Sequence, residues 1–256
     1  MRGYGLDELH SKIPELKQPA VALLAALIPI VTFIAATLIL TALDRLWPNW
    51  TLANQIAVMA LAFLTIAPFF WRHEAYTRRW GDKAYRNAFA LHVLTGLPGV
   101  FAVIVHIAFM PGERVISGSW EIPAEIAAWY FCLTGAVLDV RAILAFGFDN
   151  LSMLYVYYPQ EGRLVESKIY AVIRHPVYSA VLRLGWALAL WRGTWPALAF
   201  AAFMPLGLTL WLRLAEEREL VQRFGESYAD HRRRVPAFFP QPKNIVKFWK
   251  FLLTGS

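Results

Sequence analysis

The stretch HPVYSAVLRLGWALALWRGTWPALAFAAFMPLGLTLWL, His175–Leu212, contains two apolar runs with a very short break between them. The runs are His175–Trp191 and Trp195–Leu212, and each is close to the roughly 20 mostly apolar residues that span a membrane. Only three residues separate them, and a link this short joins antiparallel neighbours. The stretch therefore predicts a helical hairpin in a membrane, with the polar first turn of its first helix at the cytoplasmic interface.

The composition of the whole chain favours an integral membrane protein. Of its 256 residues, 58% are hydrophobic and 17% are charged, and aromatic rings are frequent. A formal net charge of +7 would suggest a nucleic-acid partner for a soluble protein, but here the basic residues flank apolar runs, so anionic lipid headgroups are the simpler partner. The single cysteine, Cys132, excludes an intramolecular disulfide and a cysteine metal cluster, and we expect it to be a small buried hydrophobe.

Four further apolar runs precede the hairpin: Pro19–Leu43, Leu52–Trp71, Ala90–Met110 and Ile122–Phe148. The fold class expected is therefore all-α, a polytopic membrane bundle of about six transmembrane helices. Most of the 25 lysines and arginines then fall on the side that holds both termini, whereas the loops of the other side hold Arg45, Arg114 and Arg192. By the positive-inside rule both termini are expected in the cytoplasm, in the inner or plasma membrane if the source is bacterial. The first run should be a permanent helix and not a cleaved signal.

The chain changes character after the hairpin. Leu214–Arg234, LAEERELVQRFGESYADHRRR, has apolar residues at spacings of mostly three or four and predicts an amphipathic helix interrupted at Gly225. After a segment with three prolines, NIVKFWKFLL predicts an interfacial helix with lysines on its polar side. We expect two parts: residues 1–120, N-terminal transmembrane helices with no recognised motif, and residues 121–256, a core with a cytoplasmic C-terminal region.

Ionisable residues inside predicted spans are candidates for function because they are costly in a membrane. Asp139 and Arg141 lie in the fourth span and Arg183 in the fifth. An Asp139–Arg183 pair would be an equally good structural explanation. His92 and His106 lie about 21 Å apart along the third helix, too far to share a metal ion. We expect them to be core or interface histidines, and no metal site is predicted.

The fifth span opens with Arg174, His175 and Pro176, followed by Tyr178. Proline is tolerated in a first helical turn, and the free N–H groups of that turn can hold an anion. The side chains of His175 and Tyr178 can line one pocket, or the basic start of the helix can simply anchor on lipid phosphate. Glu216 and Glu217 follow the hairpin and return to the same membrane face, where they could clamp a zwitterionic or cationic cofactor. On its own, the acidic pair would be a solvated helix face.

The order RHPxY, helical hairpin, EE, FGxxY, RVP and a closing proline resembles the isoprenylcysteine carboxyl methyltransferase family. This family belongs to a wider group of membrane methyltransferases that includes phospholipid N-methyltransferases. The resemblance covers about Tyr155–Pro240 and does not reach the first 120 or so residues. It implies an integral membrane methyltransferase that uses S-adenosylmethionine, with a cofactor pocket at the cytoplasmic face.

The resemblance also implies roles for individual residues. The cofactor-binding residues would be Gly162, Arg163, Leu164, Val165, Tyr170, His175, Pro176, Val177, Tyr178 and Glu216, and the catalytic residues Arg174 and Glu217. Where the eukaryotic enzymes have a substrate-side arginine, this chain has Leu212 with Arg213 beside it. We expect Arg213 and Arg183 to bind the substrate.

The expected partners are membrane lipids and a lipophilic small-molecule acceptor, and no nucleic acid is expected. A carboxylate, an amine or a thiol all fit as the methyl acceptor, and the sequence gives no oligomeric state. Two other classes of protein stay open. One is an NADPH-dependent membrane reductase of the sterol-reductase kind, for which no glycine-rich phosphate loop is visible. The other is a small non-enzymatic transporter, for which no paired repeats with broken helices are visible.

Overall fold

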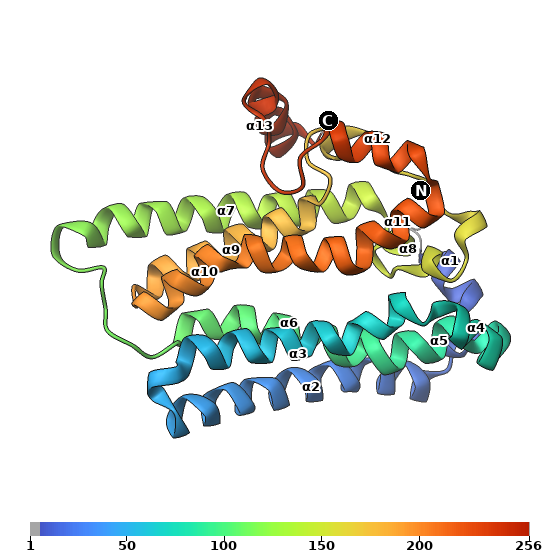
Figure 1. Ribbon diagram of the computed structural model, residues 1–256, viewed down its shortest axis with the longest axis horizontal. Coiled ribbons are helices and arrows are strands. Elements are labelled where there is room, and N and C mark those ends of the chain that lie inside the picture. The colour runs from blue at the N-terminus through green and yellow to red at the C-terminus, as the bar shows by residue number, and fades with distance from the viewer. Residues whose placement is uncertain (1–5, 256) are drawn as a thin grey trace.

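The computed structural model describes residues 6–255, and its long helices run side by side along one axis (Figure 1). Five helical stretches are long and apolar enough to cross a membrane: Pro19–Leu46, Pro48–Trp71, His73–Phe109, Gly118–Phe146 and Trp195–Phe224. The expected all-α membrane bundle is therefore confirmed. The remaining expected span, the fifth along the chain, is helix α9 (Pro176–Arg192), which lies in the same bundle but has only 17 residues. It is about 25 Å long, which is shorter than the roughly 30 Å of a hydrocarbon core.

The other long helices follow the predicted runs to within a few residues at each end. The helices before α9 are α1 (Leu6–Lys12), α2 (Pro19–Leu46), α3 (Thr51–Trp71), α4 (His73–Trp80), α5 (Ala84–Ala88), α6 (Leu94–His106), α7 (Glu121–Phe146) and α8 (Phe148–Leu151). Of these, the short helices α1, α4, α5 and α8 correspond to no predicted run. The helices after α9 are α10 (Trp195–Trp211), α11 (Glu217–Phe224), α12 (Glu226–Arg234) and α13 (Ile245–Thr254). Two π-helical turns interrupt the α-helical pattern, Phe89–Val93 between α5 and α6 and Leu212–Glu216 between α10 and α11.

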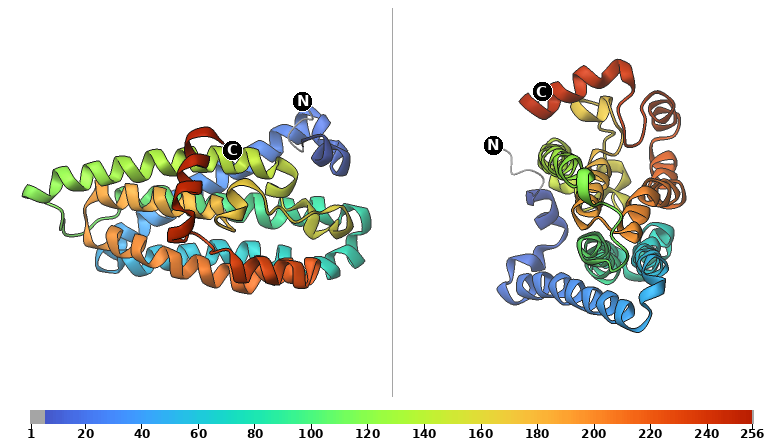
Figure 2. Two further views of the ribbon diagram at one scale, coloured as in Figure 1. Left: turned by 90° about the horizontal axis from the view of Figure 1, so that it is seen from above. Right: turned by 90° about the vertical axis from the view of Figure 1, so that its left-hand side faces the viewer.

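Helix α2 lies at the edge of the bundle and exposes most of its apolar surface, as a helix facing lipid does (Figure 2). Its buried residues are Leu40 and Asp44. The Asp44 carboxylate lies 3.4 Å from Nε2 of His106 on α6, and Nδ1 of that histidine lies 3.0 Å from Oε1 of Gln55 on α3. This buried contact ties three helices together. His92 is also buried, as expected, and its ring nitrogens contact Tyr76 and the carbonyl of a residue on α3.

The centre of the bundle is formed by α9, which packs against α7, α10 and α6, while α6 in turn packs against α2 and α3. A glycine allows α7 and α9 to approach closely. A Cβ atom on Gly135 of α7 would lie 3.1 Å from the Cβ of Arg183 and 3.2 Å from the carbonyl oxygen of Ala180. Small residues at such crossings let membrane helices pack backbone to backbone. Because Gly135 meets Arg183, the Asp139 side chain one turn further on does not, and the two charges form no ion pair in the described part of the chain.

The predicted hairpin is confirmed. Helix α9 ends at Gly193, whose left-handed φ of 69° favours glycine and whose N–H donates to the Ala189 carbonyl at 2.8 Å. Thr194 then leads directly into α10, which returns antiparallel to α9 (Figure 1). The hairpin therefore brings the end of α10 back to the level of His175, the residue that precedes α9.

The C-terminal region wraps around this end of the hairpin. Helix α10 continues through the π-helical turn into α11, which ends at Gly225 with φ 56°, and α12 follows. The chain then pairs with the segment before α9, because the backbone N–H groups of Arg174 and His175 donate to the carbonyls of Pro236 and Ala237 at 2.9 and 3.0 Å. These amphipathic helices agree with the sequence prediction.

Helix α13 crosses the outside of the bundle at a steep angle (Figure 2). Its apolar residues Phe248, Phe251 and Leu252 belong to a small core with Leu138 of α7. Arg141 of α7 caps the helix, since Nη1 donates to the Phe251 carbonyl at 2.7 Å and Nη2 to the Leu253 carbonyl at 3.0 Å. One of the three charges that the sequence places inside spans therefore holds the C-terminal helix in place.

Candidate active site

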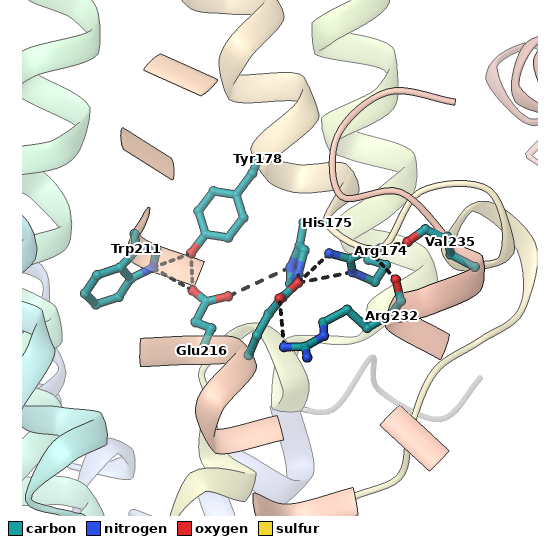
Figure 3. A network of polar contacts seen from close by, with 8 residues as sticks. Arg174, His175, Tyr178, Trp211, Glu216, Arg232 and Val235 are labelled. Carbon is teal, nitrogen blue, oxygen red and sulfur yellow. Dashed lines mark hydrogen bonds and ion pairs between the residues drawn. The ribbon is translucent and has the colours of Figure 1, made fainter. Parts of the chain in front are cut away.

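The start of α9 and the end of the α10–α11 helix bring basic, aromatic and acidic side chains together (Figure 3). We call this group the polar cluster, and it consists of Arg174, His175, Tyr178, Trp211, Glu216 and Glu217. Five of its six members come from the RHPxY and EE motifs. The short hairpin link explains why residues about 40 positions apart meet, because it makes the two helices antiparallel neighbours of equal length.

Glu217 is the centre of the basic half of the polar cluster. Its Oε1 accepts hydrogen bonds from Nε and Nη2 of Arg174 at 3.1 and 2.7 Å and lies 3.1 Å from Nε2 of His175. Arg232 lies 3.8 Å from the other oxygen. A carboxylate among these cations is ionised and only accepts hydrogen bonds. The Nε2 atom of His175 therefore carries a hydrogen, and in the neutral form of the ring this assignment makes Nδ1 the acceptor.

Glu216 is the centre of the aromatic half. Its Oε1 accepts a hydrogen bond from the Tyr178 hydroxyl and another from Nε1 of Trp211 at 3.1 Å. Its second oxygen lies 4.0 Å from Nδ1 of His175, beyond hydrogen-bond distance. These two acceptor atoms face each other across a gap that a polar group of a ligand can bridge.

Arg174 also fastens the C-terminal region to the site. Its Nη1 donates to the backbone carbonyl of Arg232 at 3.0 Å and to that of Val235 (Figure 3). One guanidinium thus binds the Glu217 carboxylate and the chain that leaves α12. The arrangement positions His175, because the same carboxylate oxygen holds both side chains.

The π-helical turn Leu212–Glu216 ends at the first glutamate of the pair. A π-helical turn contains an extra residue and changes the direction in which the following side chains point. After this turn, Glu216 faces Tyr178 and Glu217 faces Arg174. π-Helical turns are frequent at functional sites, and the sequence carries no signal for this one.

The segment predicted to contact the cofactor lies in the irregular chain between α8 and α9. Gly162 passes close to Tyr155, since a Cβ atom there would lie 3.0 Å from the tyrosine Cβ and 3.1 Å from Nη1 of Arg223. Arg163 is exposed, and Leu164 and Val165 are half-buried. Pro176 and Val177 form the first turn of α9.

The other predicted site residues lie outside the polar cluster. Tyr170 stacks on Phe146 with ring centroids 5.0 Å apart and is part of the small core beneath α13. Arg213 is exposed on the π-helical turn, and Arg183 is buried further along α9. The structure therefore brings together His175, Tyr178, Glu216 and the two expected catalytic residues, and it places Tyr170 and both expected substrate arginines elsewhere.

Trp211 of the polar cluster was not predicted as a site residue, nor were its neighbours Tyr228 and Arg232 or Arg223, which lies beside Gly162. Tyr228 is 3% exposed, and its hydroxyl has no hydrogen-bond partner among the described residues. Burial raises the pKa of Tyr228, and the nearby carboxylates of Glu217 and Glu216 raise it further. The Nε atom of Arg223 is likewise buried without a partner in the described chain. The FGxxY motif signalled Tyr228, whereas no sequence signal marked Trp211.

Comparison with known proteins agrees with this geometry. Residues 124–227 match the family described as phospholipid methyltransferase. The chain is 29% identical over 119 residues to the methanethiol S-methyltransferase of Crocosphaera subtropica, an alignment that covers 43% of this chain and 44% of the relative. It is 38% identical over 77 residues to methanethiol S-methyltransferase 2 of Bradyrhizobium diazoefficiens, covering 28% of this chain and 27% of the relative.

A third relative is a plant protein. The chain is 28% identical over 156 residues to protein-S-isoprenylcysteine O-methyltransferase B of Arabidopsis thaliana, which covers 58% of this chain and 73% of the relative. The alignments with the two methanethiol enzymes span less than half of those proteins. No solved structure is a significant match. Residues 124–227, which match the phospholipid methyltransferase family, contain the hairpin and the whole polar cluster, and the chain is distantly similar to isoprenylcysteine O-methyltransferases and methanethiol S-methyltransferases.

Proposed function

We propose that the chain is an S-adenosylmethionine-dependent methyltransferase that acts on a lipophilic acceptor at the cytoplasmic membrane face. The polar cluster carries this proposal, because it gathers the RHPxY and EE motifs into one site within the family segment. The cytoplasmic orientation is supported by the excess of lysine and arginine on the side of the bundle where the cluster lies.

The residues around the polar cluster fit S-adenosylmethionine. Unpartnered buried donors suit a ligand that carries acceptors, and two are present: the Tyr228 hydroxyl beside the two carboxylates, and Nε of Arg223, whose guanidinium lies beside Gly162. Glu216 would accept ribose hydroxyls or face a positive centre. The remaining cofactor contacts would come from residues 162–165 and from the start of α9, His175–Tyr178. Bound there, the cofactor supplies an electrophilic methyl group on a sulfonium.

The protein's part in the reaction is to position the acceptor and to exclude water. A carboxylate acceptor has no proton to lose, whereas a thiol or an amine must lose one. The free acceptor atom Nδ1 of His175 and the facing oxygen of Glu216 are placed to take that proton. We assign Arg174 and Glu217 a positioning role, since their contacts hold the His175 ring in the tautomer that leaves Nδ1 free.

The acceptor classes that fit are a thiol, a carboxylate and an amine on a lipophilic molecule. Two relatives are named for methanethiol and one for the isoprenylcysteine carboxyl group, and these names support the first two classes. The short α9 favours an acceptor that approaches from the lipid, because a helix of about 25 Å leaves its polar start within reach of both water and hydrocarbon.

The test starts with binding. Purified protein in detergent should bind S-adenosylmethionine, and His175→Ala and Glu216→Ala should each weaken binding by about tenfold or more, the loss expected for one charge-assisted contact. Arg233→Gln, which changes an exposed pair on α12, is the matched control. Equal binding by all four proteins would show that the site assignment is wrong.

The second step is transfer. The protein is incubated with methyl-labelled S-adenosylmethionine and a total lipid extract of its host, and the products are separated into aqueous, organic and volatile fractions. Label in the organic fraction identifies a lipid acceptor, and label only in the volatile fraction identifies a small thiol or a readily hydrolysed methyl ester. Absence of both transfer and cofactor binding would refute the proposed function.

A further inference from the structure

Arg183 is a buried cation for which the described chain offers no anion. Its side chain is on α9, about 11 Å along the axis from the first residue of that helix, and the residue is 7% exposed. Its Nε has no hydrogen-bond partner, and no carboxylate lies within ion-pair distance of the guanidinium in the described residues. Its attractive neighbour is the Phe248 ring of α13, whose centroid lies 5.0 Å from the guanidinium carbon.

A buried charge without a partner is strongly unfavourable in an apolar environment. The acidic residue that could have neutralised it, Asp139, forms no ion pair with it among the described residues; this carboxylate adds to the effect of burial in raising the pKa of Tyr170. The close contact between Gly135 and the Arg183 Cβ explains why Asp139 is one turn out of register. Neutralisation of Arg183 therefore requires an anion from outside the described chain.

Two further buried polar groups near Arg183 also have no partner among the described residues. The Ser179 hydroxyl, fully buried, lies one turn before Arg183 on the same face of α9. The Tyr170 hydroxyl belongs to the small core that includes Phe248. Because the Asp139 carboxylate acts on the Tyr170 hydroxyl, the donors left for an anion are the Arg183 guanidinium and the Ser179 hydroxyl, and a carboxylate or phosphate requires such donors.

We propose that Arg183 binds the carboxylate or phosphate of an anionic membrane amphiphile between α7, α9 and α13. An amphiphile is favoured over a free anion because the surroundings are apolar, including Leu138 and Phe248. Helix α13 offers the membrane both highly exposed apolar residues, Val246 and Leu253, and lysines that attract anionic lipid.

This site is separate from the polar cluster. Five residues at 100° each place Arg183 about 140° around α9 from Tyr178. Tyr178 faces the α10–α11 side through Glu216 and Trp211, whereas Arg183 faces α7 and α13. The proposal therefore goes beyond the proposed function, and it holds whether or not the protein transfers methyl groups. Its consequence is that a lipid anion holds α13 against the bundle.

The test uses the full chain in neutral detergent with dibromostearate, a carboxylate amphiphile that quenches nearby tryptophan fluorescence. Trp249 follows Phe248 directly and serves as the reporter. Oleate and dodecyl phosphate should displace the quencher, whereas oleyl alcohol and inorganic phosphate should not. Equal displacement by oleyl alcohol would refute anion recognition, and equal displacement by inorganic phosphate would refute the amphiphile. This comparison needs no variant.

The variants then assign the residue. Arg183→Gln should weaken binding of dibromostearate by about tenfold or more, and Arg183→Lys should fall between the two because it keeps the charge without the planar fork. Arg192→Gln, at the far end of the same helix, is the matched control and should bind like the parent. Unchanged binding in Arg183→Gln would overturn the proposal. Binding of S-adenosylmethionine reports separately on the polar cluster, so failure of one inference is distinguishable from failure of the other.

Discussion

Replacement of Glu217 by glutamine tests whether the polar cluster holds the C-terminal region to the hairpin. The substitution keeps the size of the side chain and removes its charge. In the parent, one buried carboxylate oxygen receives two hydrogen bonds from Arg174 and contacts His175. In the variant, the guanidinium keeps the backbone carbonyls of Arg232 and Val235 as its acceptors.

The size of the effect follows from burial. The side chains of Arg174 and Glu217 are 11% and 5% exposed, so solvent screens their interaction little. Removal of one partner of a buried ion pair typically costs about 3–5 kcal/mol. The remaining carbonyl acceptors place this case near the lower end, at about 3 kcal/mol. For a chain of this size a loss of 1 kcal/mol lowers the melting temperature by about 2–4 °C, so we expect a decrease of about 6–12 °C.

The assay is thermal unfolding in detergent followed by tryptophan fluorescence. Glu226→Gln is the matched control, because it removes the same charge from an exposed pair with Arg233 on α12. Exposed pairs contribute little to stability, and this variant should melt within about 2 °C of the parent.

A double-mutant cycle separates the pair from other effects of the substitutions. If Arg174 and Glu217 stabilise the protein through each other, the loss in Arg174→Gln/Glu217→Gln is smaller than the sum of the losses in the single variants. Melting of Glu217→Gln within about 2 °C of the parent, or additive losses in the cycle, would refute the reasoning and leave the cluster without a structural role.

Three further predictions concern residues outside the polar cluster. Burial lowers the pKa of His231. Its contribution to stability is therefore complete above about pH 6.5 and is lost as the pH falls through its folded-state pKa, because the unfolded chain binds its proton at a higher pH. The melting temperature of His231→Gln should depend less on pH between 7 and 5 than that of the parent, and an equal pH dependence would contradict this. Gly96→Ala should destabilise the protein by about 1–3 kcal/mol, because its Cβ would lie 2.5 Å from an isoleucine of α3. Gly207→Ala is the control and should be neutral, because its Cβ would meet no atom within 4 Å. Equal melting temperatures of the two variants would show that α3 and α6 pack more loosely than the structure indicates. Asp44→Ala should cost about 3 kcal/mol because it leaves buried His106 without its carboxylate, and a purely additive effect in combination with His106→Gln would rule out that pairing.

The bundle was predictable because its elements are set by composition and length. An apolar run such as Pro19–Leu43 cannot stay in water and has to satisfy its backbone internally, so a helix is the available solution. The break at Gly193 and the helix start at Pro176 follow from local backbone preferences that are readable in the sequence. The shortness of α9 was predictable as well, because the apolar run His175–Trp191 corresponds to a helix of about 25 Å, and α9 has 17 residues.

Only those residues of the candidate site that belong to sequence motifs were predictable. Arg174, His175, Tyr178, Glu216 and Glu217 occur in recognisable order, and the short hairpin link places their two segments at the same end of the bundle. Trp211 belongs to no motif, and its indole joins the site because α10 packs beside α9. An apolar residue at the end of a membrane span carries no signal that distinguishes such a contact from ordinary burial.

The charges inside the spans show why spacing along the chain cannot replace register between helices. From the sequence alone, Asp139 could neutralise either Arg141 or Arg183, and the other arginine would stay unpaired. The close packing at Gly135 sets the register of α7 against α9 and leaves Asp139 without an ion pair to Arg183, while Arg141 binds the carbonyls that end α13. The cation left unpaired is therefore Arg183, at a position that α13 covers with an aromatic ring. A buried guanidinium in this state requires an external anion, and that requirement follows from helix register and not from any motif.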